Sequence, residues 1–169
     1  MPFSYLNRYM EEGIMRELPE PKLSLLGHME LSVAKPHLPK KTPVGNRRII
    51  QVTGGRFEGE YFNAKVLPGG DDWITVREDG TIIQDVRITL ETDDGEIILM
   101  TYRGIRTGER SVLNRLDQGE EVDPDEYYFR TNPVFETGSE KYHWMNNRIF
   151  ISNGIRMPEG VSYSIYTVE

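Results

Sequence analysis

The chain lacks cysteine, long apolar runs and any excess of positive charge. With no Cys among its 169 residues, disulfides, thiol catalysis and thiolate metal sites are excluded. No stretch approaches the roughly 18 uninterrupted apolar residues that a membrane-spanning helix requires. Asp plus Glu number 27 against 20 Lys plus Arg, and the resulting net charge of −7 argues against nucleic acid or an anionic membrane surface as a partner.

Targeting features are also missing. Residues 1–12 carry charges where a signal peptide needs an apolar run, and the chain has no Asn-x-Ser/Thr glycosylation site. We therefore expect a cytoplasmic location. Hydrophobic residues make up 37% of the chain and charged residues 28%, which is typical of a globular protein with its own core.

Residues 3–18 have the spacing of an amphipathic helix. The apolar residues that recur at helical intervals are Phe3, Leu6, Met10, Ile14 and Leu18. Prolines at positions 19 and 21 end this helix. We expect residues 1–22 to form a helical extension that covers a barrel mouth or a neighbouring subunit, and residues 23–169 to form the main domain.

From residue 23 onward the apolar period changes to two, which is typical of strands. The expected strands are 23–33, 47–53, 56–67, 72–77, 81–92, 96–105, 127–136, 141–152 and 161–168. Asp79-Gly80 and Asp94-Gly95 are the strongest hairpin signals. Short strands without helix-length insertions must pair antiparallel. A closed antiparallel β-barrel hides the strand edges best, and a two-sheet sandwich is the alternative.

Residues 106–126 interrupt this pattern with an acidic insertion that contains a helical turn near residues 112–116. Insertions of this length are often lids or binding loops. A solvated loop without a role is the other interpretation.

The strand at 81–92 has two distinct faces. Its even positions are apolar except for Gln84, and its odd positions include Asp85 and Arg87. If the odd face meets water, Asp85 and Arg87 form a weak surface pair, and periodicity alone favours this assignment. If the odd face lines a barrel interior, the pair is a candidate acid–base site.

Aromatic residues mixed with polar ones gather near the expected strand at 141–152. Tyr142, Trp144 and Asn146 share one of its faces. Such a mixture is typical of a pocket for a flat, partly polar small molecule. The alternative is that the rings fill a barrel core.

Several motifs together carry a family resemblance. In chain order they are Gly45-Asn46-Arg47-Arg48, Gly54-Gly55-Arg56-Phe57-Glu58-Gly59, Leu67-Pro68-Gly69-Gly70-Asp71-Asp72-Trp73, Asp79-Gly80, Asp85-Val86-Arg87, Thr92-Asp93-Asp94-Gly95, Tyr128-Phe129-Arg130, Phe135-Glu136-Thr137 and Tyr142-His143-Trp144-Met145-Asn146. Over about residues 23–168 the chain resembles the domain-of-unknown-function family numbered three-two-three-seven, also called uncharacterised protein family three-eleven. The resemblance implies a lipocalin-like barrel, often oligomeric and without an established cofactor. It also implies a link to the catabolism of aromatic compounds in a few members.

With the resemblance included, we expect Asp85 and Arg87 to face the barrel interior. Asp85 then acts as general acid or base and Arg87 holds an anionic intermediate. Glu136 is the alternative proton carrier and Arg130 the alternative anion partner.

The expected substrate-binding set surrounds this pair. Its members are Arg48, Asp72, Trp73, Tyr102, Tyr142, Trp144 and Asn146. For Asp72 and Trp73, a turn with Trp packed beneath it is an equally good interpretation. The three histidines, His28, His37 and His143, have no metal-ligand spacing, so we expect no metal.

These features predict an enzyme without a cofactor, a lyase, hydratase or isomerase that acts on a small aromatic or polyketide-like compound inside the barrel. A non-catalytic barrel that binds such a compound is the alternative. A homo-oligomer is also expected, assembled through the N-terminal helix or an apolar outer strand face.

Overall fold

The segments with period-two alternation form antiparallel strands that pair mostly with their chain neighbours. The computed structural model describes residues 18–169. Its strands are β1 (Leu23–Val33), β2 (Lys41–Thr42), β3 (Gly45–Gly59), β4 (Asn63–Val66), β5 (Gly70–Val76), β6 (Ile82–Thr92), β7 (Ile97–Gly108), β8 (Tyr127–Glu136), β9 (Phe150–Met157) and β10 (Gly160–Val168). The helix expected over residues 3–18 falls, except for its last residue, outside the described residues.

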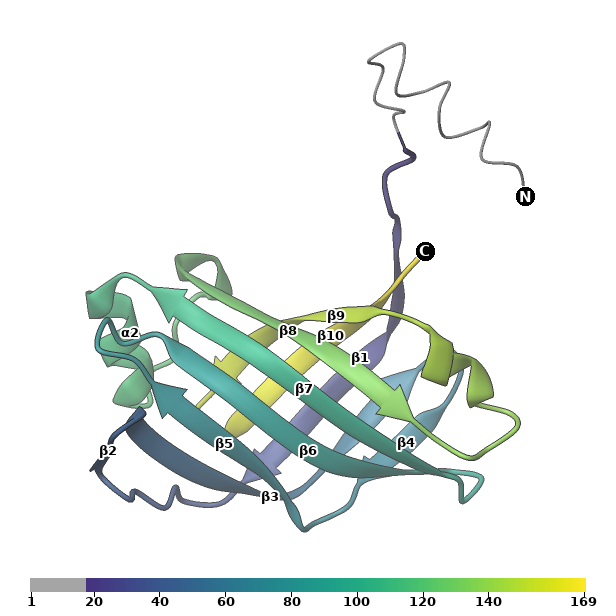
Figure 1. Cartoon of the computed structure of the whole chain (residues 1–169), viewed down its shortest axis with the longest axis horizontal. Helices are drawn as coiled ribbons and strands as arrows, with labels where there is room; N and C mark the ends of the chain where they lie inside the picture. Colours follow the sequence, from purple (N-terminus) through teal and green to yellow (C-terminus); the bar gives the residue numbers. More distant parts are fainter. Residues whose placement is uncertain (1–17) are drawn as a thin grey trace, which may run out of the picture.

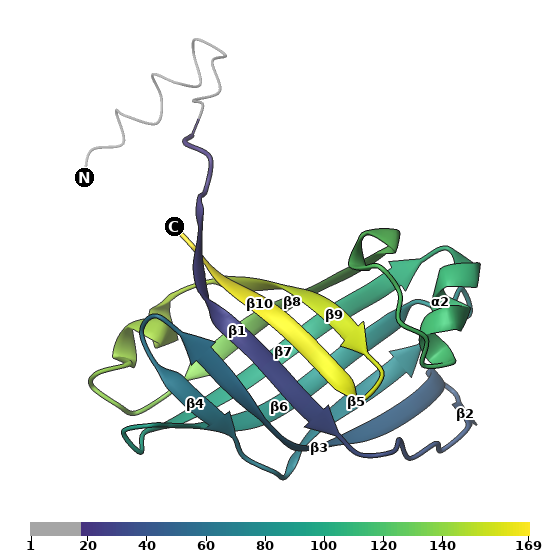
Figure 2. The same ribbon diagram turned by 180° about the vertical axis from the view of Figure 1, so that it is seen from behind.

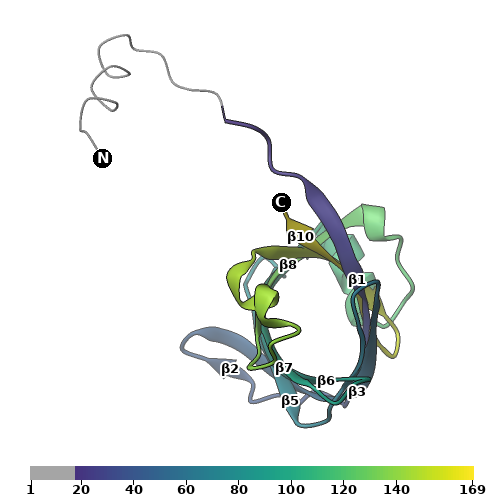
Figure 3. The same cartoon turned by 90° about the vertical axis from the view of Figure 1, so that its right-hand side faces the viewer.

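The sheet closes on itself because β1 pairs with both β10 and β3. β4 and β5 each pair with β3 on one side and β6 on the other, so they share one position in the ring. The result is an antiparallel barrel of eight strand positions, seen end-on in Figure 3. The expected barrel is confirmed, and the sandwich alternative is wrong.

Glycines let β1 and β3 approach closely where the ring closes. A Cβ at Gly27 would collide with the Glu58 carbonyl, and a Cβ at Gly55 would collide with the Glu30 carbonyl. Gly55 also has a φ of +151°, which side chains rarely adopt. The Gly-rich run at residues 54–59 therefore serves barrel closure.

Three strand predictions differ from the structure. The expected strands 47–53 and 56–67 are one long strand, β3, followed by the short β4. The expected strand 141–152 is wrong: residues 143–147 form a 3₁₀ helix, η2 (His143–Asn147), and β9 begins only at Phe150. The backbone N–H of Met145 donates to the Tyr142 carbonyl at 3.0 Å, so the alternation of side chains does not apply there.

Short helices lie near the two ends of the barrel (Figures 1 and 2). At one end is α2 (Arg110–Asp117), with a 3₁₀ turn, η1 (Pro124–Glu126), after it; η2 lies at the other end. Val112, Leu113 and Leu116 of α2 are buried, so the acidic insertion covers the barrel end with its apolar face. Among residues 18–169, no helix has the length and apolarity to cross a membrane.

The η2 half of the barrel is filled with packed aromatic rings. Phe57 stacks on Phe62 with centroids 4.5 Å apart, and Phe135 meets Phe150 edge-on at 4.8 Å. Tyr142 adds its ring against Phe62. These rings form a closely packed core in this half of the barrel interior.

Candidate functional site

A cavity of about 280 Å³ lies inside the barrel beneath α2. Its apolar lining comes from Leu31, Val33, Ile50, Val52, Ile74, Ile82, Leu116 and Val161. Its polar lining consists of Arg48, Asp72, Gln84, Tyr102, Arg106, Asp117, Arg156 and Tyr163. An apolar cavity with a few converging polar groups is the usual form of a small-molecule site.

Asp72 is a buried carboxylate on the inner face of β5. It is 8% exposed, Gln84 Nε2 donates to its Oδ2 at 3.0 Å, and the Asp85 backbone N–H donates to its Oδ1 at 3.3 Å. Burial raises the pKa of Asp72 to about 6, although the hydrogen bond from Gln84 opposes the shift. Asp72 can therefore gain or lose a proton near neutral pH, as a general acid or base requires.

Tyr102 and Tyr163 form a hydrogen-bonded pair beside Asp72. The Tyr102 hydroxyl donates to the Tyr163 oxygen at 3.1 Å, and Gln84 Nε2 approaches the same oxygen at 3.4 Å. Burial raises the pKa of both phenols above the ordinary value of 10, so both stay neutral donors. Because Tyr163 accepts from two groups, its own hydrogen is left for a bound oxygen atom.

Gln84 joins these groups, and the residue opposite it makes room for its side chain. Gln84 pairs across the β6–β7 ladder with Gly104, and a Cβ at Gly104 would collide with Gln84 Oε1. The absence of a side chain at Gly104 thus leaves room for the Gln84 amide, which reaches both Asp72 and Tyr163.

Three arginines and Asp117 form the α2 side of the cavity. Arg48 donates to both Asp117 carboxylate oxygens at 3.1 Å, which ties β3 to the end of α2. Arg106 Nη2 lies 3.7 Å from Asp117 Oδ1. Burial alone would raise the pKa of Asp117, but Arg48 and Arg106 hold it below its usual range. Asp117 is therefore a permanent anion at this end.

The expectation that Asp85 and Arg87 face the interior is wrong. Their side chains are 41% and 71% exposed and lie 3.8 Å apart as an ion pair on the outer face. The even residues of β6, including Val86 and Ile88, fill the core, so alternation sends the odd ones outward. A pair in this setting is worth at most about 1 kcal/mol.

The alternative pair, Glu136 and Arg130, also lies on the outer face of β8. Both are exposed, because positions 129, 131 and 135 of the same strand point inward. Arg130 Nη1 donates to the Phe129 carbonyl at 2.9 Å, and its guanidinium covers the Tyr128 ring. Neither residue reaches the cavity.

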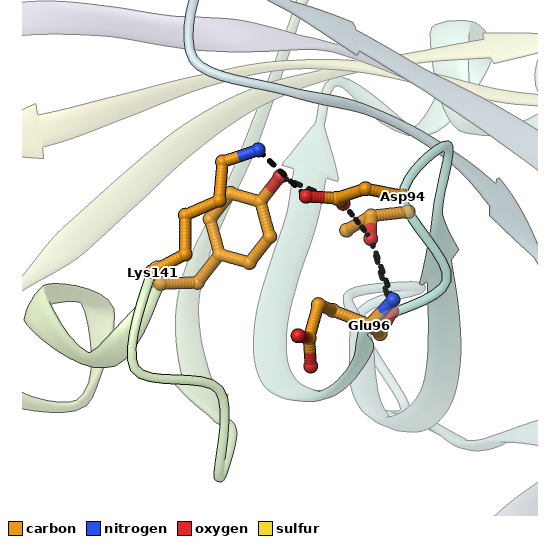
Figure 4. A network of polar contacts seen from close by, with 5 residues as sticks. Asp94, Glu96 and Lys141 are labelled. Atoms are coloured by element: carbon orange, nitrogen blue, oxygen red, sulfur yellow. Dashed lines mark hydrogen bonds and ion pairs between the residues drawn. The ribbon is translucent and has the colours of Figure 1, made fainter.

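Tyr142 is buried at the η2 end, far along the barrel from the cavity lining. Its hydroxyl donates to Asp94 Oδ1 at 3.0 Å, and Lys141 Nζ lies 2.6 Å from Asp94 Oδ2 (Figure 4). Thr92 completes this network, which joins the β6–β7 turn to the segment before η2. The expected role of Tyr142 in stacking on a substrate therefore has no geometric support.

Trp144, Asn146 and Trp73 also lie away from the cavity. Trp144 packs against Tyr61 with centroids 5.6 Å apart. The Asn146 side chain exchanges two 2.9 Å hydrogen bonds with the backbone of Thr137. Trp73 is 45% exposed, because Asp72 occupies the inward position beside it. Of the expected site residues, the structure brings together Arg48, Asp72 and Tyr102.

Sequence reasoning missed Gln84, Arg106, Asp117, Arg156 and Tyr163 as lining residues. Gln84 carried a visible signal, because it is the polar interruption on an otherwise apolar face of its strand. Tyr163 and Arg156 lie in short terminal strands where no comparable contrast exists. Within the described residues, no three His, Asp or Glu side chains are grouped so as to hold a metal ion.

The fold and the cavity define a class: a closed antiparallel β-barrel with a half-polar interior site capped by a short helix. A family model described as "Protein of unknown function (DUF3237)" matches residues 21–168. The chain belongs to this family, and the resemblance seen in its motifs is confirmed.

Relatives extend across most of the chain. A UPF0311 protein of Clostridium acetobutylicum is 44% identical over 125 residues, covering 74% of this chain and 79% of that protein. The crystal structure of a conserved protein of unknown function from Rhodopseudomonas palustris matches with a TM-score of 0.87 at 32% identity, covering 90% of this chain and 100% of that one. A protein of Penicillium herquei named a hydroalkoxylation enzyme is 27% identical over 127 residues, covering 75% of this chain and 70% of that protein.

Proposed function

We propose that the barrel is an enzyme that transfers protons on a small, partly aromatic or polyketide-like compound held in the cavity. The reaction is of the lyase, hydratase or isomerase type. The observation that carries this proposal is the buried Asp72, whose pKa is raised to about 6, beside the neutral Tyr163 donor. Carboxylate acid–base chemistry with phenol donors suffices for such reactions, so the proposal needs no cofactor.

The name of the Penicillium relative supports one reaction of this type, the addition of an O–H group across a carbon–carbon double bond. For a phenol next to an enone, the Asp72 carboxylate takes the phenol proton as the new C–O bond forms. The Tyr163 hydroxyl donates to the carbonyl oxygen, where negative charge develops. The protonated Asp72 then returns the proton to the carbon beside the carbonyl, so the product is an isomer of the substrate.

The arrangement of donors favours this order of events. Gln84 Nε2 bridges Asp72 Oδ2 and the Tyr163 oxygen, so the proton carrier and the oxyanion donor lie on either side of one amide. Both groups are buried among apolar side chains, where charge stabilisation by fixed donors is stronger than in water.

The test uses ortho-hydroxychalcone and ortho-allylphenol as probes in deuterated buffer near pH 6. Mass spectrometry measures the cyclised isomer and its incorporated deuterium. We expect the wild-type protein to accelerate cyclisation of at least the activated enone, and Asp72→Asn to lower the rate by about 100-fold or more.

Asp85→Asn is the matched control, because Asp85 is a carboxylate of the neighbouring strand that lies on the outer face. It should keep its rate within about twofold of wild type. Equal losses in both variants, or binding of the probes by the wild-type protein without turnover, would contradict the proposal. The second result would instead favour the non-catalytic binding barrel.

A further inference from the structure

Positive charge gathers around the cavity although the chain as a whole is acidic. The net charge of the chain is −7, yet Arg48, Arg106 and Arg156 all line the cavity. The carboxylates that line it are Asp72 and Asp117. Three arginines against two carboxylates give the cavity lining an excess of positive charge.

The three arginines differ in how completely they are paired. Arg48 holds both oxygens of Asp117 through two hydrogen bonds. Arg106 reaches the same carboxylate only at 3.7 Å, and its buried Nε has no hydrogen-bond partner. Arg156 donates to the Gly160 carbonyl at 2.6 Å and forms no ion pair within residues 18–169.

An incompletely paired guanidinium inside a barrel is costly to maintain. Arg106 is 8% exposed, and its guanidinium lies 6.0 Å from the Phe129 ring. Burial lowers the pKa of Arg106, and so does the charge of Arg156 nearby. A buried charge is normally compensated by a partner of opposite sign, so a ligand anion would complete this arrangement.

The geometry points to a carboxylate subsite in which Arg106 and Arg156 bind the acid group of the substrate while its hydroxyl or carbonyl end meets Tyr163. This inference rests on the proposed function and narrows its substrate class to aromatic or unsaturated carboxylates. The planar fork of Arg106 suits a carboxylate. Phe129 packs against both the Arg106 guanidinium and the Tyr163 ring, so both groups are supported by the same core side chain.

A structural role for Arg106 makes a different prediction. If Arg106 only supports Asp117 and α2, its replacement lowers stability and weakens charged and neutral ligands alike. If Arg106 binds the ligand's acid group, its replacement removes the preference for a charged ligand over a neutral one of the same shape.

The experiment measures binding of para-hydroxycinnamate and its amide to the full chain by calorimetry at pH 7. We expect the acid to bind the wild-type protein about tenfold more tightly than the amide. Arg106→Gln should abolish this preference. Arg103→Gln, on the outer face of the same strand, is the matched control and should retain it.

A second variant guards against misfolding as the explanation. Asp117→Asn removes the protein's own carboxylate that competes with the ligand for Arg106. It should therefore tighten binding of the acid several-fold and leave the affinity for the amide unchanged. Structural damage would weaken both ligands. The subsite is overturned if the wild-type protein binds acid and amide equally well or binds neither. It is also overturned if Arg106→Gln retains the preference for the acid.

These results separate the subsite from the proposed function. Asp72→Asn should keep the preference for the acid, because it leaves the arginines in place. Binding with the expected preference but no turnover of any probe overturns the proposed function alone. Turnover of neutral phenols with no preference for acids overturns the subsite alone.

Discussion

At the scale of the residue, burial gives Asp72 a chemistry that the same side chain lacks in water. Its two carboxylate oxygens receive hydrogen bonds from Gln84 and from the Asp85 backbone, yet desolvation outweighs them and favours the protonated form. Ionised Asp72 therefore destabilises the folded state at neutral pH. Groups of this kind concentrate at functional sites.

This destabilisation predicts a pH-dependent difference in the free energy of unfolding between the wild-type protein and Asp72→Asn. The pKa of about 6 in the folded protein lies above the ordinary value of 3.8 that the unfolded chain retains. The stabilisation from protonated Asp72 is therefore complete below about pH 4 and is lost as the pH rises through 6. The loss is about 3 kcal/mol at most. Urea unfolding at pH 4 and pH 7.5 should show the Asn variant gaining stability relative to wild type only at the higher pH.

Asp85→Asn provides the comparison for this measurement, since its side chain is 41% exposed. It should change the free energy of unfolding by less than about 0.5 kcal/mol at either pH. If Asp72→Asn and wild type differ by the same amount at pH 4 and pH 7.5, the raised pKa is contradicted.

At the scale of the element, strand alternation decides which residues reach the cavity. On β6, Gln84 points inward while Asp85 and Arg87 point outward; on β5, Asp72 points inward while Trp73 points outward. The sequence predicted correctly which β6 residues share a face. Periodicity alone favoured the odd face as the outer one, which the structure confirms. Including the family resemblance reversed this assignment, and the reversed assignment is wrong.

The strand predicted for the aromatic segment near residue 144 was wrong for another reason. Periodicity cannot separate a short 3₁₀ turn from a strand when polar and aromatic residues alternate. η2 therefore looked like a strand, and Tyr142, Trp144 and Asn146 were assigned a shared face that the structure does not contain. By contrast, the turns at Asp79-Gly80 and Asp94-Gly95 were predictable, because tight hairpin turns need a residue with positive φ and glycine adopts it readily. Both glycines have positive φ in the structure, 86° and 85°.

Barrel closure at the β1–β3 seam depends on glycine and yields a second stability prediction. Gly55→Ala would place a Cβ against the Glu30 carbonyl in a backbone conformation that disfavours side chains. We expect a loss of about 2 kcal/mol or more in the free energy of unfolding, measured by urea denaturation.

Gly138→Ala is the matched control, because a Cβ there meets nothing within 4 Å. It should stay within about 0.5 kcal/mol of wild type. A Gly55→Ala variant as stable as Gly138→Ala would mean that the seam tolerates a wider separation of β1 and β3 than the structure shows.

At the scale of the whole molecule, the barrel divides into a packed half and a hollow half. Phenylalanine rings fill the end near η2, and the end beneath α2 holds the cavity with its arginines, tyrosines and Asp72. The acidic insertion supplies the cover of the hollow end through Leu116 and Asp117. The sequence predicted the barrel and the insertion. It could not predict which half of the barrel is packed and which is hollow, because this depends on how side chains from strands far apart in the chain pack together.

The location of ligand in a crystal structure of the protein with para-hydroxycinnamate tests this account most directly. We predict electron density inside the α2 half, with one polar end within hydrogen-bond distance of Tyr163 and the carboxylate facing Arg106. Density confined to the outer face, for example beside Arg103 and Tyr128, would contradict an interior site and the roles given to Asp72 and Tyr163.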